Sequence, residues 1–126
     1  MYNVLIACAS EENARYLEET LSSTYRVQCC FAEADAVEIL QTQKPEILVL
    51  ELSTPEMVGL AVLSKTSYQP PVILALVRTL SLQTKCRALF LGVQAIVGLP
   101  AAPEQVLEHL KRMTAEFLEM PTAPRL

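Results

Sequence analysis

The chain has 126 residues, 19% of them charged, with a formal net charge of −4, a composition typical of one globular domain with a single core. The negative charge and the lack of a Lys/Arg cluster argue against direct binding of nucleic acid by this domain. Apolar runs stay well below the roughly 18 residues of a membrane span, and the first residues lack the basic start of a signal peptide. We therefore expect a cytoplasmic protein that does not bind membranes.

Strand and helix signals alternate along the chain, which predicts a parallel α/β sheet. Short apolar segments bounded by turn residues predict five strands, at about Asn3–Ala7, Arg26–Phe31, 47–51, Val72–Val77 and Ala95–Val97. Apolar residues at helical spacing predict a helix that begins after Ser10, with Ala14, Leu17 and Leu21 on one face, a helix at about 33–42 with Ala36, Val37 and Leu40 inward, and helices at about 58–65, 81–91 and 103–117.

Local signals support the helix ends. Ser10 is a good N-cap, Gly92 can adopt the left-handed conformation that stops a helix, and Pro103 suits the first position of the last helix. Five βα units of this length predict a doubly wound three-layer sandwich with strand order 2-1-3-4-5, as in flavodoxin-like folds. We expect one domain over residues 1–118 and a tail or linker over 119–126.

Residues 45–59 carry the most functional information. The run Ile47-Leu48-Val49-Leu50 is apolar on both faces, as expected of a central parallel strand covered by helices on each side. The run stops at a single carboxylate, Glu51, with Pro55 and Gly59 following it. Open α/β sheets place their sites at the carboxyl ends of the strands, so Glu51 marks the candidate site.

In this layout the chain resembles the phospho-acceptor strand and loop of response-regulator receiver domains, the CheY-like family. The resemblance spans about residues 2–116 and includes further fragments in the expected order: Pro71-Val72-Ile73, Arg87-Ala88-Leu89, Leu91-Gly92, Pro100 and Pro103-Glu104. It implies a signalling module of the two-component type whose acceptor is an aspartate at the position of Glu51.

The family's assisting groups are replaced in this chain. The resemblance places two acids at Cys8 and Ala9, a Ser or Thr at Leu76, an aromatic switch at Ile96 and a Lys at Leu99. Phosphoryl transfer to a carboxylate needs a cation held by oxygen ligands and polar groups that meet the phosphoryl oxygens. With Glu51 as the only evident carboxylate, we expect no Mg²⁺ site and interpret the chain as a degenerate pseudo-receiver that is not phosphorylated.

Glu51 has two interpretations. In one, its longer side chain mimics a phosphorylated aspartate and holds the domain in one signalling state. In the other, which the loss of the sensing hydroxyl and lysine favours, it is a solvated acid at a strand end without a switching role.

The cysteines raise an alternative function. Cys8, Cys29, Cys30 and Cys86 form no Cys-x-x-Cys pair, and the single histidine, His109, is interpreted as a surface residue of the last helix, so no zinc site is expected. We expect reduced thiols, with Glu11 and Glu12 raising the pKa of Cys8.

A small thiol-dependent enzyme using Cys8 remains the alternative, because this residue lies between a strand end and a helix N-terminus. The loop Ala9-Ser10-Glu11-Glu12 is acidic and lacks the glycines that cradle phosphate, which argues against phosphatase and flavin sites. With three glycines in the chain, no nucleotide-binding loop is available, so no cofactor and no enzyme are expected.

The remaining candidate is a protein-binding surface. Receiver domains commonly use the face of the fourth helix, fifth strand and fifth helix for dimers or partners. On this face the chain has Leu80, Phe90 and Ile96, and exposed apolar patches often mark interfaces. We therefore expect a protein partner or a second copy there.

Overall fold

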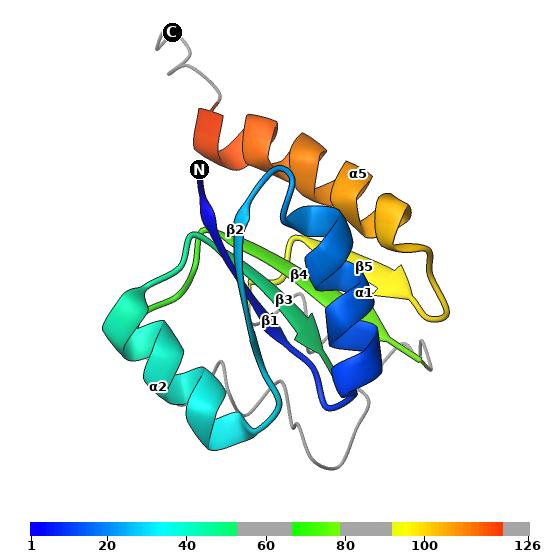
Figure 1. The fold of residues 1–126 in the computed structure, drawn as a ribbon. Helices are drawn as coiled ribbons and strands as arrows, with labels where there is room; N and C mark the ends of the chain where they lie inside the picture. The colour runs from blue at the N-terminus through cyan, green and yellow to red at the C-terminus, as the bar shows by residue number, and fades with distance from the viewer. Residues whose placement is uncertain (53–66, 79–91, 120–126) are drawn as a thin grey trace, which may run out of the picture.

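A computed structural model of the chain describes residues 1–52, 67–78 and 92–119 and shows a parallel sheet between helical layers (Figure 1). The sheet has five strands, β1 (Asn3–Ala7), β2 (Arg26–Cys30), β3 (Ile47–Glu51), β4 (Val72–Val77) and β5 (Ala95–Gly98). All neighbouring strands are parallel, in the order β2-β1-β3-β4-β5. The predicted topology is confirmed, and β2 stops one residue early because its partner β1 ends where Ala7 pairs with Cys30.

The described helices cover both faces of the sheet (Figure 1). They are α1 (Glu11–Leu21), α2 (Glu33–Gln43) and α5 (Pro103–Thr114), the last continued by a π-helical turn, η1 (Ala115–Glu119). Helices α1 and α5 pack on one face and α2 on the other, as a doubly wound three-layer sandwich requires. The helices predicted at 58–65 and 81–91 lie outside the described residues, as does most of the predicted tail.

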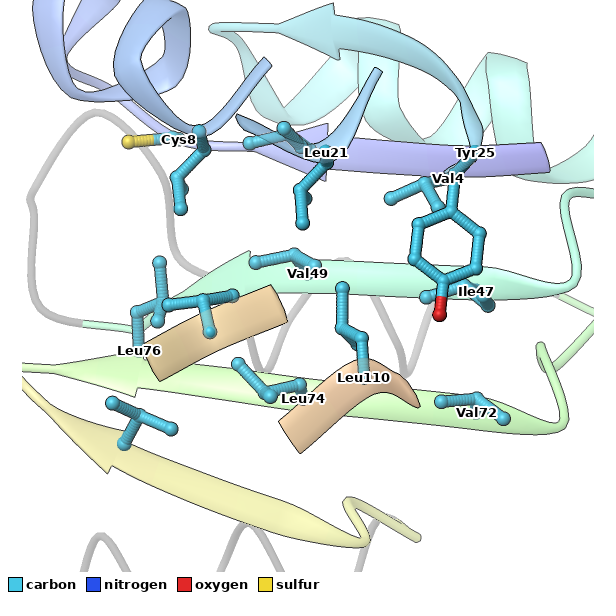
Figure 2. Packing of buried hydrophobic residues seen from close by; sticks show 14 of the residues in the cluster. Val4, Cys8, Leu21, Tyr25, Ile47, Val49, Val72, Leu74, Leu76 and Leu110 are labelled. Atoms are coloured by element: carbon cyan, nitrogen blue, oxygen red, sulfur yellow. The ribbon is translucent and has the colours of Figure 1, made fainter. Parts of the chain in front are cut away.

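Two apolar clusters, one on each face, fix the sheet in place. Alternate residues of β1, β3 and β4 point to the α1/α5 face, for example Val4, Val49 and Leu74 (Figure 2). Their neighbours, such as Leu48 and Ile73, point to the α2 face. Each fully buried aliphatic side chain contributes about 1.5–3 kcal/mol to the stability of the fold. The carboxyl ends of the central strands are therefore held by a stable core.

The predicted starts of α1 and α5 are confirmed, and Gly92 has the predicted left-handed backbone, although the helix it was expected to end lies outside the described residues. Ser10 is extended, and its hydroxyl accepts a hydrogen bond from the Asn13 amide at 3.2 Å. Gly92 has a φ of 89°, and a Cβ there would lie 2.2 Å from the side chain of Gln69. The last helix is α-helical to Thr114 and continues as the π-helical turn η1, so its predicted end at about Phe117 falls within η1.

Among the parts of the chain that the structure covers, no helix is long and apolar enough to cross a membrane.

Candidate functional site

The carboxyl ends of β1, β3 and β4 bring the candidate site together. Ala7 of β1 pairs with Leu50, and Glu51 pairs with Leu76 of β4. Because side chains alternate along a strand, Glu51 continues the row of Ile47 and Val49 toward the α1/α5 face. Cys8 and Leu76 lie at this same end of the cluster, away from Tyr25, Ile47 and Val72 (Figure 2).

The Glu51 side chain is completely buried, with 0% of its surface exposed. Its Oε1 accepts a hydrogen bond from the Ala9 amide at 3.3 Å and lies 3.7 Å from Cys8 Sγ, whose proton is shared with the Ser10 carbonyl at 3.6 Å. The interpretation of Glu51 as a solvated acid is therefore wrong. Its side chain turns toward the end of β1, beneath the helices of the α1/α5 face, instead of extending into solvent.

The second carboxylate oxygen of Glu51 is also buried, and it has no hydrogen-bond partner among residues 1–52, 67–78 and 92–119. Most buried side-chain oxygens in proteins form a hydrogen bond, so a buried carboxylate oxygen without one is unusual and calls for a specific explanation. Leaving such a group unsatisfied costs about 1–3 kcal/mol.

A pocket of about 170 Å³ opens beside this carboxylate. Four of the positions at which the resemblance implies phosphoryl chemistry line it: Cys8, Glu51, Leu76 and Leu99. Ala9 contributes only its amide to Glu51, while Ile96 packs partly buried against the opposite, α2-side cluster. The structure therefore brings most of the predicted site positions together. Cys8 lies where the resemblance implies an acid, Leu76 where it implies a hydroxyl and Leu99 where it implies a lysine.

Three polar residues of the pocket were not predicted from the sequence. Arg78 follows directly after β4, and Asn13 and Tyr16 project from the first turns of α1. A charged residue immediately after a central strand is the same signal that identified Glu51, so Arg78 could have been found from the sequence. Asn13 and Tyr16 depend on how α1 packs and had no such signal.

The thiols near the site are strongly disfavoured as thiolates. Burial raises the pKa of Cys8 to about 11, and the charge of Glu51 adds to this, against a lowering by the Ser10 backbone and by Arg78. Burial likewise raises the pKa of Cys29 and of Cys30 to about 12.

The predicted direction of the Cys8 shift is confirmed, but its assignment to Glu11 and Glu12 is wrong, because the main cause is burial and the nearby acid is Glu51. The three thiols that the structure describes are free, and Cys86 lies outside the described residues. A thiol held protonated in this way is a poor nucleophile, so the enzyme alternative gains no support.

The residues at the strand ends do not fit Mg²⁺, the cation of phosphoryl transfer. Mg²⁺ requires several oxygen ligands, and within residues 1–52, 67–78 and 92–119 no three His, Cys, Asp or Glu side chains come together as a metal site. His109 lies on α5, away from these strand ends, and its Nδ1 accepts a hydrogen bond from Arg112 at 2.7 Å.

Solved structures share the fold of this chain. The chemotaxis protein CheY4 of Vibrio cholerae is 24% identical over 90% of this chain and 98% of its own, with a TM-score of 0.79. The chain has the fold of response-regulator receiver domains. A CheY-like receiver domain protein from Methanospirillum hungatei is 17% identical, over 96% of this chain and 99% of its own, with a TM-score of 0.87. The receiver domain of a Francisella response regulator is 16% identical, over 92% and 98%, with a TM-score of 0.80.

Comparison with protein-family models gives no match, and comparison with curated proteins gives none either. The solved structures confirm the predicted resemblance to receiver domains at the level of the fold. Of the predicted partner-binding residues, Ile96 is partly buried, whereas Leu80 and Phe90 lie outside the described residues.

Proposed function

We propose that this chain is a pseudo-receiver, a cytoplasmic signalling module that binds a protein partner without being phosphorylated. The observation that carries the proposal is the environment of Glu51. A receiver acceptor must be open to an incoming phosphoryl group, whereas the Glu51 carboxylate is fully buried and one of its oxygens accepts a hydrogen bond from Ala9, just after β1.

The surroundings of the carboxylate lack the chemistry that phosphoryl transfer requires. An incoming phosphoryl group carries charge on three oxygens, which must be met by a metal ion and by donors. At the matching places the pocket presents the aliphatic side chains of Leu76 and Leu99. Apolar groups there leave the charge unpaired in a poorly solvated site, which is strongly unfavourable.

We assign Glu51 a structural role in place of a catalytic one. It lies on β3 and contacts the two residues that directly follow β1, Cys8 and Ala9, so it links two strand ends that a receiver joins through a metal ion. Such a fixed link supports one constant conformation at this edge of the sheet. A constant conformation suits a module whose output depends on partner binding alone.

The test is a titration with Mg²⁺ and beryllofluoride, followed by the amide NMR signals of Ala9 and Leu52. The proposal expects no saturable shift at millimolar Mg²⁺, and acetyl phosphate should add no mass to the protein. Saturable shifts centred on these amides, or a stable phosphorylated species, would overturn it.

For the partner surface we propose the face that contains Ile96 together with Leu80 and Phe90. The support is the sequence pattern, since apolar residues replace the polar and aromatic residues that the receiver resemblance implies there. Phe90→Glu should weaken association, measured by sedimentation or by partner capture, without lowering the melting temperature.

Phe31→Glu is the matched control, because Phe31 is an aromatic residue with 40% of its surface exposed that directly follows β2, at the opposite edge of the sheet from β5. It should leave association unchanged. Loss of folding in Phe90→Glu would place Phe90 in the core and refute the surface, and unchanged association in a folded variant would place the partner elsewhere.

A further inference from the structure

Strand β2 forms one edge of the sheet, and part of its backbone faces away from the other strands. Within residues 1–52, 67–78 and 92–119 it pairs with β1 alone, while β5 forms the opposite edge. Arg26 and Cys30 form backbone hydrogen bonds with the residues on either side of β1, at 2.9 and 3.1 Å. Because backbone groups alternate in direction along a strand, the N–H and C=O groups of Val27 and Cys29 point to the open edge. Such an edge can accept a further strand.

The two ends of this edge carry opposite charges. Side chains alternate along β2, and Cys30 belongs to the cluster on the α2 face, so Arg26 and Gln28 also point to that face. Beside Cys30, a hollow of about 350 Å³ is lined by two exposed acids of α2, Asp35 and Glu38. Burial and then the charge of Asp35 raise the pKa of the Cys30 thiol, in agreement with this proximity. The edge is therefore basic where β2 begins and acidic where it ends.

These charges are available to a partner. Arg26, Asp35 and Glu38 form no ion pair with one another or with any other residue in the part of the chain that the structure describes. Exposed ion pairs contribute only about 0.2–1 kcal/mol each. The backbone hydrogen bonds of an added strand would therefore supply most of the affinity, and the charges would select its identity and direction.

A second copy of the chain can complete the open edge. When two β2 strands run antiparallel around a two-fold axis at Gln28, Val27 of each copy lies opposite Cys29 of the other. Residues paired in this way exchange both of their backbone hydrogen bonds. The contact then uses the same surface of both copies, as a two-fold dimer requires.

The same register brings the opposite charges together. Arg26 of one copy lies opposite Cys30 of the other, beside the hollow that Asp35 and Glu38 line. By symmetry, the other end of the contact has the same arrangement. The chain is thus complementary to itself in both charge and backbone hydrogen bonding, which favours a second copy over a strand of another protein.

We propose that β2 is the contact surface for a second copy of this chain, which pairs with it antiparallel and joins two sheets into one. The surface lies at the opposite edge of the sheet from β5, so it is separate from the proposed partner surface. One short strand from each copy buries less than the roughly 1,200 Å² of a stable interface, so the dimer should be weak, with a dissociation constant on the order of 0.1 mM.

Sedimentation equilibrium and amide NMR of the intact chain test the dimer. The unmodified chain should pass from monomer to dimer between about 10 μM and 1 mM. Over the same range the amide signals of Val27 and Cys29 should shift, because their N–H groups gain hydrogen-bond partners.

Exchanging the charges tests the register. Arg26→Glu would face the acids of an identical copy, and Asp35→Lys/Glu38→Lys would face its arginine, so each variant alone should dimerise at least about tenfold more weakly. An equimolar mixture of the two should restore dimerisation, since both ends of the mixed dimer again join opposite charges. Arg112→Glu is the control: it makes the same charge change on α5, which packs against α1 and β4, and should dimerise like the unmodified chain.

Three results would each overturn the proposal: an unmodified chain that stays monomeric at about 1 mM, an Arg26→Glu variant that dimerises as well as the unmodified chain, or a folded mixture that fails to restore the dimer. Thermal melts confirm that the variants are folded. Phe90→Glu and Phe31→Glu should both dimerise normally, because neither residue belongs to β2. Loss of the dimer in Phe90→Glu alone would place the second copy at the proposed partner surface and refute the contact through β2.

Discussion

Glu51 Oε1 accepts a hydrogen bond from the Ala9 amide at 3.3 Å, and this contact joins the ends of two neighbouring strands across the site. Oε2 of the same carboxylate is buried and has no partner in the part of the chain that the structure describes. The Glu51 side chain therefore stabilises the fold through one hydrogen bond and destabilises it through one unpaired oxygen. A substitution that removes both shows which contribution to the free energy of unfolding is larger.

Replacing Glu51 with Met should increase the free energy of unfolding by about 1 kcal/mol. The unsatisfied oxygen costs about 1–3 kcal/mol, whereas the bond to the partly buried Ala9 amide contributes about 1 kcal/mol or somewhat more. Urea denaturation measures the difference. Glu12→Gln should stay within about 0.5 kcal/mol of the unmodified chain. Destabilisation of Glu51→Met by more than about 1 kcal/mol would show that the link to β1 dominates.

A second polar contact fixes α5 against the amino-terminal half of the chain. The hydroxyls of Tyr25 and Thr114 lie 3.0 Å apart in the interior. Thr114→Val keeps the shape and leaves the Tyr25 hydroxyl buried without its partner, so it should lower the free energy of unfolding by about 1–3 kcal/mol.

Adding Tyr25→Phe to Thr114→Val should recover part of that loss, because both partners are then apolar. A double-mutant cycle measured by urea denaturation should give a coupling energy of at least about 0.5 kcal/mol. Strict additivity of the two single changes would mean that the two hydroxyls do not interact.

Most of the fold was predictable because it depends on local patterns. The runs Ile47–Leu50 and Val72–Val77 are apolar on both faces, and the structure buries both along their full length. Ser10 marks a helix start through its own side chain, without help from distant residues. Such signals survive in a single sequence since each is satisfied within one element and its immediate neighbours.

The site was predictable in its location but not in its character. The alternation of side chains places Glu51 on the same face as Val49, yet its burial depends on how the beginnings of α1 and α5 close over the strand ends. The pocket residues Tyr16 and Val106 come from those two helices, more than 80 residues apart in the sequence. How separate helices pack determines which of their side chains meet at the pocket. The residue pattern within one segment carries no information about that packing.

The thiols provide a test by pH. Burial raises the pKa of Cys8 from an ordinary 9.0 to about 11 and that of Cys30 to about 12. At pH 8 the thiolate fraction of Cys8 is then about a hundredfold below that of an unperturbed thiol. Iodoacetamide labelling followed peptide by peptide should therefore be at least that much slower in the native chain than in urea.

The same shifts predict loss of stability at alkaline pH. The folded state holds these protons more tightly than the unfolded state does, so the thiols' contribution to stability is fully present below about pH 9. It declines as the pH rises toward about 11 to 12. Cys30→Ala should flatten this decline in urea denaturation. Rapid labelling of Cys8 near neutral pH would contradict the protonated state and revive a catalytic thiol.

The proposal that the chain does not bind Mg²⁺ can be tested by rebuilding the site. Glu51→Asp alone should give no saturable Mg²⁺ response, because the shorter carboxylate still has a thiol and an alanine beside it. The triple variant Cys8→Asp/Ala9→Asp/Glu51→Asp provides three carboxylates at the ends of β1 and β3 and should bind Mg²⁺ at millimolar concentration.

Three acids in a poorly solvated site repel one another, so the triple variant should melt at a lower temperature without Mg²⁺ and regain stability when Mg²⁺ is added. Thermal melts with and without the ion measure this, and Ca²⁺-free buffers keep the comparison specific. A Mg²⁺-dependent rise in the melting temperature of Glu51→Asp alone would show that the remaining oxygen atoms suffice to hold the ion. The loss of the acid pair at Cys8 and Ala9 would then not be what separates this chain from a phosphorylated receiver.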